Sequence, residues 1–372
     1  MHTHAAGAQP LSGSSRRPKP KANDPLGAAV TVVRPDYGNE RLSVDQNGGF
    51  PVLRYRGGPH SFRDLPSKLT LVRRLLSQDR YDVVHAMDWP FFLPVALCAK
   101  PSQRRVHTLH GSDIIEMTAP LKRAAIRLSG LFAGSCEVVA NSAFTRRLFL
   151  AEFPSVDPAR VRFEHLGVSG FWSGAESAER RALGLPDDKF VLLTVARLTP
   201  RKGQSEVIEA LRLLPPQIRA RVCYAIVGPG YDEAYLRAVK AQIAEAGCDV
   251  RYFGERSNEE VRRLYKASDL FCLVGKPIPN GPIEGFGLVF LEAAAQGLPS
   301  PAGDIGGVSE VVLDGVTGVV VPVEHPTAVA RAIEDLVNRP KRLEALGRGA
   351  LRRANELTWL RCAASTYGLA GA

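Results

Sequence analysis

The strongest constraint on the fold is a pattern of alternating strands and helices that runs through the chain twice. Short runs rich in Val, Leu and Ile that end at turns are typical of buried strands. The first run of the pattern predicts strands at 28–33, 52–55, 81–85, 105–109 and 137–141. The second run predicts strands at 190–195, 221–227, 249–253, 270–273 and near 318–321. Helices are expected between them, at 62–78, 121–132, after Ser142, at 203–214, 258–266, from Leu288 and from Pro326. This alternation predicts an α/β fold of two Rossmann-like domains with parallel, doubly wound sheets.

The length of 372 residues also favours two domains. Residues 1–27 are rich in Ser, Gly, Pro, Lys and Arg, and we expect a disordered tail because they cannot bury enough apolar surface to offset their ordering entropy. We expect an N-terminal Rossmann-like domain at 28–172, a second, ligand-binding domain at 173–352, and a C-terminal helix at 353–372 that crosses back to the first domain. A ligand is expected in the cleft, where the carboxyl ends of both sheets meet.

The charge of the chain is uneven. Residues 1–172 carry 23 Lys and Arg against 14 Asp and Glu, a net charge of +9, whereas residues 173–372 carry 25 against 24. The basic half is expected either to meet an anionic partner, such as a membrane surface, or to be a solvated basic face. It has no basic motif interleaved with aromatic residues, so no nucleic acid is expected as a partner. The six cysteines are scattered and no apolar run is long enough to span a bilayer, which indicates a cytoplasmic protein with reduced thiols.

Two glutamates eight positions apart are the leading candidates for a binding site. Glu284 lies in a Gly-rich turn that opens a helix near Leu288, and Glu292 lies about two helical turns further on, roughly 12 Å along the axis. Gly285 and Gly287 let the backbone approach a ligand, and the free amides of the helix start favour an anion. A ligand in which a diphosphate lies between two groups of hydroxyls, those of a hexose and those of a ribose, is a sugar nucleotide.

A second candidate follows the strand at 190–195. Arg197 and Lys202 come directly after this strand, before Gly203 and the start of a helix. Two cations at a Gly-rich helix entry form a clamp for a diphosphate.

These segments resemble motifs of the retaining GT-B glycosyltransferases of family 4, the glycosyl transferases group 1. The stretch from Glu284 to Glu292 resembles the Glu-x7-Glu signature, and Arg197 to Gly203 resembles the Gly-Arg-x4-Lys-Gly loop, with Ala196 in place of the first Gly. The segment 303–310 resembles the Asp-x-Gly-Gly-x-x-Glu turn that follows the signature helix. The resemblance covers about residues 28–372.

The resemblance implies roles for individual residues. His110, in His-Gly-Ser-Asp113, would lie against the transferred sugar, and Asp113 would either order that loop or contact the acceptor. Arg197 and Lys202 would neutralise the leaving diphosphate beside Glu284. The remaining donor-binding residues would be Gly254, Glu255, Arg256, Gly285, Phe286, Gly287, Leu288 and Glu292.

The function expected from these motifs is transfer of a hexose, with retention of configuration, from a nucleoside-diphosphate sugar to an acceptor hydroxyl. Glycan, glycolipid and natural-product biosynthesis are all open, as are UDP and GDP. No cofactor and no metal are expected, because cations and amides neutralise the phosphates. The protein is expected in the cytoplasm, with the inner face of the membrane as a candidate surface. A GT-B sugar-nucleotide epimerase and a non-catalytic sugar-nucleotide binder are the alternatives.

The beginning of the chain departs from the family pattern. The strand expected at 28–33 resembles the second strand of the family, and residues 1–27 contain no strand, Gly-Gly loop and helix. We therefore expect the first domain to have one βα unit fewer than the second, and donor binding to be weaker for lack of that loop.

Overall fold

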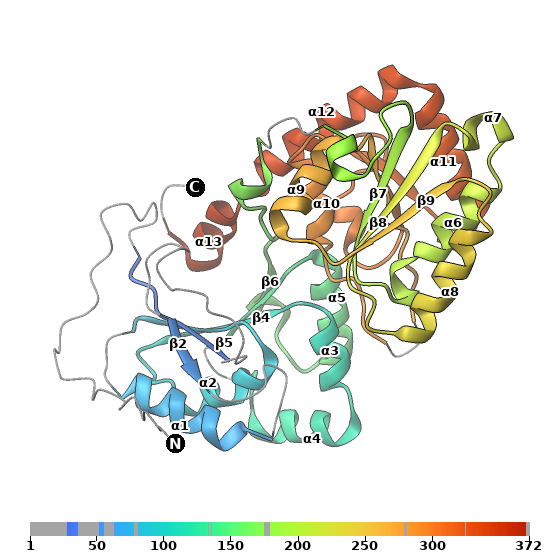
Figure 1. The fold of residues 1–372 in the computed structure, drawn as a ribbon. Coiled ribbons are helices and arrows are strands. Elements are labelled where there is room, and N and C mark those ends of the chain that lie inside the picture. Colours follow the sequence, from blue (N-terminus) through green and yellow to red (C-terminus); the bar gives the residue numbers. More distant parts are fainter. Residues whose placement is uncertain are drawn as a thin grey trace, which may run out of the picture. The chain divides into compact units, whose positions relative to one another are not determined.

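A computed structural model of the chain describes residues 28–35, 52–55, 63–77, 81–132, 134, 136–174, 179–278, 281–323 and 325–369 (Figure 1). The structure divides into two compact units. The first comprises the residues up to His107 together with Ser129–Glu137, and the second comprises Thr108–Leu128 and Val138–Ala372. The expected tail at 1–27 lies outside the described residues. The expected domain limits at 172 and 352, and the smaller number of βα units in the first domain, remain predictions.

The first half of the chain contains two groups of strands. β1 pairs in parallel with β2, and a second sheet has the order β3-β4-β5-β6. These strands are β1 (Val32–Pro35), β2 (Val52–Tyr55), β3 (Val83–Ala86), β4 (Arg104–Leu109), β5 (Cys136–Ala140) and β6 (Val161–Phe163). The prediction of a strand at 28–33 was wrong at its start, because the ladder with β2 begins only at the pair Val32 and Val52.

The helices of this half are α1 (Leu65–Leu76), α2 (Phe92–Cys98), α3 (Ser112–Met117), α4 (Pro120–Ser129) and α5 (Ala143–Glu152). Short 3-10 turns lie at Trp89–Phe91, Pro158–Arg160 and Gly170–Trp172. Ser142 caps α5 as predicted, since its side chain accepts a hydrogen bond from the amide of Thr145 at 3.0 Å.

The second half of the chain forms a parallel sheet of the Rossmann type. Its central strands have the order β10-β7-β8-β9, and an isolated bridge between Leu273 and Ala302 brings β11, paired with β12, next to β10. These strands are β7 (Phe190–Val195), β8 (Val222–Val227), β9 (Asp249–Gly254), β10 (Leu270–Phe271), β11 (Ser300–Gly303) and β12 (Gly318–Val321). If the strands of this sheet are numbered by their order in the chain, starting at β7, their order in space from β9 to β12 is 3-2-1-4-5-6. The strand order reverses between β7 and β10, and this is where Rossmann folds bind ligands.

The two faces of this sheet bury different sets of side chains, because successive strand residues point to opposite sides. In β7, Leu192 packs into the core beneath α6, α8 and α11, whereas Val191 and Leu193 pack into the core beneath α9 and α10. Figure 1 shows α6 and α8 on one side of β7–β9, and α9 and α10 on the other. These helices are α6 (Gln204–Arg212), α8 (Glu233–Ala244), α9 (Asn258–Ala267), α10 (Leu288–Ala294) and α11 (Pro326–Asn338).

The chain ends in two further helices, α12 (Pro340–Glu356) and α13 (Trp359–Tyr367). Arg162 of β6 donates hydrogen bonds to the carbonyls of Ser365 and Thr366, so the end of α13 lies against β6. The remaining short elements are α7 (Pro216–Arg219) and 3-10 turns at Arg181–Leu183, η6 (Pro200–Lys202) and η7 (Val308–Glu310). In the part of the chain that the structure describes, no helix has the length and hydropathy needed to cross a membrane.

Candidate functional site

Two loops meet at the point where the strand order reverses. The loop after β7 carries the predicted cations and ends at Gly203, and the loop after β10 leads to the predicted glutamates. The amide of Lys276 donates to the carbonyl of Arg201 at 2.9 Å. Gly203 has a φ of +75°, and a Cβ at this position would collide with the carbonyl of Val274. The two backbones are therefore in direct contact, which only glycine permits here.

An ion pair joins these loops. The Nζ of Lys202 lies 2.6 Å from Oε2 of Glu284, and a terminal nitrogen of Arg201 lies 3.0 Å from the same oxygen. All three side chains are less than a fifth exposed. Burial opposes the charge of Glu284, but the two cations hold the pKa of its carboxyl below the ordinary value. Burial lowers the pKa of Lys202, and Arg201 acts in the same direction against the attraction of Glu284.

The structure thus brings the predicted Lys202 and Glu284 together and adds Arg201, which sequence reasoning missed. Arg201 precedes Lys202 in the same basic turn, so its charge and position were the available signal. Arg197, the other predicted cation, is exposed at the end of β7, and its backbone carbonyl accepts a hydrogen bond from Gln204 at 3.1 Å.

The turn that carries Glu284 is packed between two other backbone segments. A Cβ on Gly285 would collide with the carbonyl of His110, so the predicted sugar-side loop lies directly against this turn. Gly287 has a φ of +100° and precedes α10, which begins at Leu288 as predicted. The ring of Phe286 is buried in the core beneath α9 and α10 and so anchors the turn, while Leu288 is partly buried against the same core.

Asp113 orders the loop that contains His110. Its carboxylate accepts hydrogen bonds from the amides of His110 at 3.0 Å, Gly111 at 2.8 Å and Ile114 at 3.0 Å. Burial raises the pKa of the Asp113 carboxyl despite these bonds. Of the two roles left open by the sequence, this geometry corresponds to ordering of the loop. The side chain of His110 itself is exposed.

Glu292 lies on α10 and is tied to α9. The hydroxyl of Tyr265 donates to Oε2 of Glu292 at 3.2 Å. Burial raises the pKa of Glu292 to about 7, and the bond from Tyr265 offsets only part of this shift. A carboxyl that titrates near neutral pH in such a place is typical of a functional position.

The predicted base-side residues Gly254, Glu255 and Arg256 lie at the end of β9. The carbonyl of Gly254 accepts from the amide of Gly228 at 2.8 Å, and the side chains of Glu255 and Arg256 are exposed. Within the described residues, no hydrogen bond or ion pair joins these three to the turn of Glu284.

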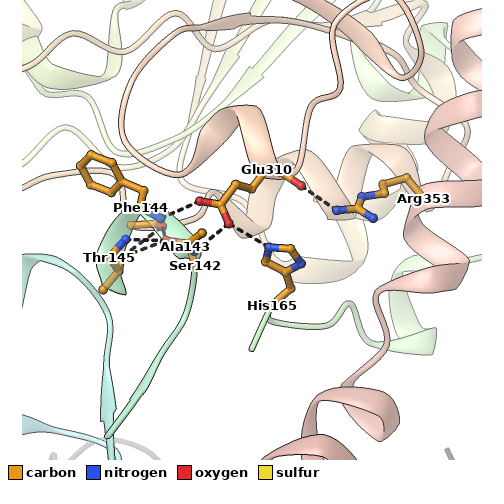
Figure 2. A network of polar contacts seen from close by, with 8 residues as sticks. Ser142, Ala143, Phe144, Thr145, His165, Glu310 and Arg353 are labelled. Atoms are coloured by element: carbon orange, nitrogen blue, oxygen red, sulfur yellow. Dashed lines mark hydrogen bonds and ion pairs between the residues drawn. The ribbon is translucent and has the colours of Figure 1, made fainter. Parts of the chain in front are cut away.

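A polar network around Glu310 and Ser142, which the sequence did not predict as functional, contacts the turn of Glu284 through Gly285 (Figure 2). Ser142 donates to the carbonyl of Gly285 at 2.6 Å, and Glu310 binds both the first turn of α5 and the ring of His165. The sequence predicted a helix that starts after Ser142, and a turn at 303–310 that by its resemblance to the family motif closes the donor pocket. The bonds from the amides of Ala143 and Phe144 to Glu310 join segments that are far apart in the sequence, and they have no local signal in it.

Comparisons with known proteins show the family of this chain. Residues 175–353 match the family described as Glycosyl transferases group 1, and residues 23–169 match Glycosyltransferase Family 4. A D-inositol 3-phosphate glycosyltransferase of Stackebrandtia nassauensis is 30% identical over 375 residues, covering 93% of this chain and 83% of that protein. The chain belongs to the family 4 glycosyltransferases.

Other known proteins are similar to this glycosyltransferase over most of their length. A GDP-mannose-dependent alpha-(1-6)-phosphatidylinositol monomannoside mannosyltransferase of Mycolicibacterium smegmatis is 32% identical, covering 76% of this chain and 74% of that protein. The crystal structure of Anabaena HepE in complex with UDP matches with a TM-score of 0.72 and 23% identity, covering 86% of this chain and 85% of that one. Sucrose-phosphate synthase from Thermosynechococcus elongatus matches with a TM-score of 0.73 and 21% identity, covering 91% and 88%. The α/β fold with parallel sheets is that of the GT-B glycosyltransferases, as predicted.

Proposed function

We propose that this glycosyltransferase transfers a hexose from a nucleoside-diphosphate sugar to an acceptor hydroxyl, with retention of configuration and without a divalent metal. The observation that carries the proposal is the contact of Lys202 and Arg201 with Glu284 where the strand order of the sheet reverses. This arrangement offers cations to a diphosphate and a carboxylate to the hydroxyls of the attached sugar.

The ion pair explains how the site stays charged before the donor binds. Glu284 neutralises Lys202 and Arg201, two largely buried cations that would be costly to leave unpaired. The donor diphosphate takes over these cations, and Glu284 is released to accept hydrogen bonds from sugar hydroxyls. As the bond between sugar and phosphate breaks, the cations stabilise the charge that develops on the leaving phosphate.

The other predicted residues surround this centre in the proposal. His110 lies against Gly285 and faces the transferred sugar, while Glu292 holds the ribose further along α10. The acceptor hydroxyl attacks from the face that the diphosphate leaves, and the leaving phosphate takes its proton. The cations of the loop after β7 do the work that a metal ion does in other transferases.

The names of the relatives support a choice of donors and acceptors. One relative uses GDP-mannose, and HepE was solved with UDP, so both bases remain candidates. Relatives that act on D-inositol 3-phosphate or on a phosphatidylinositol mannoside favour an inositol-containing acceptor. The acceptor is therefore proposed to carry a phosphorylated inositol, either free or as part of a lipid.

We also propose that the protein works in the cytoplasm at an anionic membrane surface. Leu121 and Leu128 lie seven positions apart on α4, and their side chains are 88% and 89% exposed. Lys122 and Arg127 are exposed on the same helix, and Ile126 is buried and anchors it. Exposed leucines beside basic residues are typical of helices that lie in a membrane interface.

The test of the proposed function is a turnover screen of UDP- and GDP-sugars with D-inositol 3-phosphate and phosphatidylinositol as first acceptors. We expect one donor to be used, and NMR of the product to show the anomeric configuration of that donor. An inverted product would overturn the retaining mechanism, and isomerisation of the donor without transfer would favour an epimerase. Donor binding with no turnover on any acceptor and no donor hydrolysis would favour a non-catalytic binder. Loss of activity in EDTA that Mg²⁺ or Mn²⁺ restores would contradict metal independence.

A further inference from the structure

We propose that Ser142, His165 and Glu310 form a clamp, here called the α5 clamp, that positions the turn of Glu284 for glycosyl transfer. The three are positioning residues, because they act on the donor through this turn. The inference rests on the proposed function, in which the turn of Glu284 holds the transferred sugar.

Glu310 fixes the start of α5 with two strong hydrogen bonds. Its Oε2 accepts from the amide of Ala143 at 2.8 Å and its Oε1 accepts from the amide of Phe144 at 2.7 Å. These amides belong to the first turn of the helix and have no acceptor within it, and a carboxylate is favoured there by the helix dipole. Figure 2 shows the carboxylate facing the first turn of α5 and the ring of His165. Glu310 therefore ties α5 to the segment that follows the signature helix.

Two further contacts hold Glu310 itself. The Nε2 of His165 lies 2.9 Å from Oε2 of Glu310, and Arg353 donates to the backbone carbonyl of Glu310 at 2.7 Å. The carboxylate of Glu310 thus has hydrogen-bond partners on α5 and in the segment after β6, and the backbone carbonyl of Glu310 has a partner on α12. A residue held on three sides has little freedom to move, so it can define the position of α5.

Ser142 passes this position on to the donor turn. As the cap of α5 it is fully buried, and its hydroxyl accepts from the amide of Thr145. Its one proton has two acceptors within reach, the carbonyl of Gly285 at 2.6 Å and Oγ1 of Thr145 at 3.0 Å, and the shorter distance favours Gly285. The hydroxyl of Thr145 is a second, longer donor to the same carbonyl, at 3.4 Å. Gly285 is directly preceded in the chain by Glu284, which the proposed function places against the sugar. A shift of the first turn of α5 would therefore move Gly285 and, with it, the carboxylate of Glu284.

The turn is also held from the side of Glu310. The amide of Gly307 donates to the carbonyl of Glu284 at 3.0 Å, and the ring of His165 stacks on that of Phe286 with centroids 5.4 Å apart. A Cβ on Gly307 would collide with the carbonyl of Gly285, so the segments pack backbone against backbone. Three consecutive residues of the turn are thus held by the clamp or by its neighbour Gly307.

This chain of contacts predicts a particular kinetic signature. Ser142→Ala and Glu310→Gln should each lower kcat about tenfold, because a small displacement of a catalytic group is costly. The KM for the donor should change less than kcat does, within about twofold, because in the proposed function the diphosphate is held by the loop after β7 and the ribose by Glu292 on α10. Because both residues act on the same turn in series, the double variant should lose about as much as either single variant rather than the hundredfold of independent effects.

Matched controls separate positioning from loss of fold. Thr358→Ala removes the same kind of helix cap from α13, where the hydroxyl accepts from the amide of Arg361, and Glu344→Gln removes an exposed acid on α12. Turnover is expressed per site that binds UDP or GDP, counted by calorimetry, so unfolded protein does not lower it. We expect Thr358→Ala to lower the melting temperature as Ser142→Ala does, with kcat per site unchanged. Equal kcat per site in wild type, Ser142→Ala and Glu310→Gln would overturn the clamp.

A second readout needs no donor. Hydrogen exchange at the amide of Gly307, which donates to Glu284, should accelerate in Ser142→Ala but not in Thr358→Ala. Wild type that transfers no sugar would overturn the proposed function, and the clamp would then be judged by this exchange alone. Exchange at Gly307 that is the same in both variants would overturn the clamp whatever the activity.

Discussion

At the scale of single residues, Lys202 and Glu284 are expected to carry most of the chemistry. Glu284→Ala and Lys202→Ala should each lower turnover at least about a hundredfold, which corresponds to about 2.7 kcal/mol of transition-state stabilisation. The physical reason is that each removes one half of the charge pattern that the donor meets. Steady-state kinetics on folded variants, verified by circular dichroism, measures the effect. Near-normal turnover in both variants would remove this turn as the donor site.

Glu292 should act on binding, and its effect should depend on pH. Burial raises its pKa to about 7, so the carboxyl is largely protonated below that value. If the carboxylate accepts the ribose hydroxyls, the KM for the donor should rise as the pH falls from 8 to 6. In Glu292→Gln the KM should be raised at every pH, with a smaller change in kcat. A wild-type KM that is flat over this range, or a Gln variant that binds UDP and GDP normally, would contradict the assignment.

At the scale of elements, α4 gives a direct test of the membrane proposal. Leu121→Ser with Leu128→Ser should weaken co-sedimentation with anionic vesicles, because both side chains are almost fully exposed and contribute nothing to the core. The assay compares anionic vesicles that contain phosphatidylserine with neutral vesicles of phosphatidylcholine. It is done at low salt so that the electrostatic attraction is preserved. Equal recovery of wild type with both vesicles would show that α4 is only a solvated basic helix.

The elements also show which parts of the fold the sequence could predict. The strands β2, β7 and β12 have the predicted bounds, because their runs of Val and Leu stop at clear turns. β11 was missed because Ser-Pro-Ala-Gly has a poor strand composition. It forms because all four residues are buried and β12 pairs with it. The helix α8 was missed too, although Asp232 caps it and could have marked its start.

The candidate site also has parts that the sequence could predict and parts that it could not. The sequence could predict that Lys202 and Glu284 lie near each other, because both follow strands that a Rossmann order places side by side, but it did not predict their ion pair. The clamp could not be predicted, since Ser142 and Glu310 are brought together only by tertiary packing. Phe286 was predicted as a donor-binding residue, and periodicity could not show that its ring is buried in the core.

At the scale of the whole molecule, Glu292 should make stability fall as the pH rises. Its pKa is about 7 in the folded protein against an ordinary value of 4.5, so the folded state binds the proton more tightly. The stabilisation is complete below the unfolded value and is lost as the pH rises through about 7, by on the order of 3 kcal/mol if no other group compensates. The melting temperature of wild type should therefore fall between pH 5 and 8 more steeply than that of Glu292→Gln. Parallel curves for the two proteins would show that Glu292 is ionised throughout.

The ion pair between Arg201 and Glu284 has a consequence for how the molecule folds. The two residues are 83 positions apart, and the strands that carry their loops, β7 and β10, are neighbours in the sheet but not in the sequence. The contact closes a long loop that contains β8 and β9, and contacts between residues so far apart in the sequence form slowly. If the proposed donor site is right, recovery of nucleotide binding during refolding should therefore lag behind recovery of helix content.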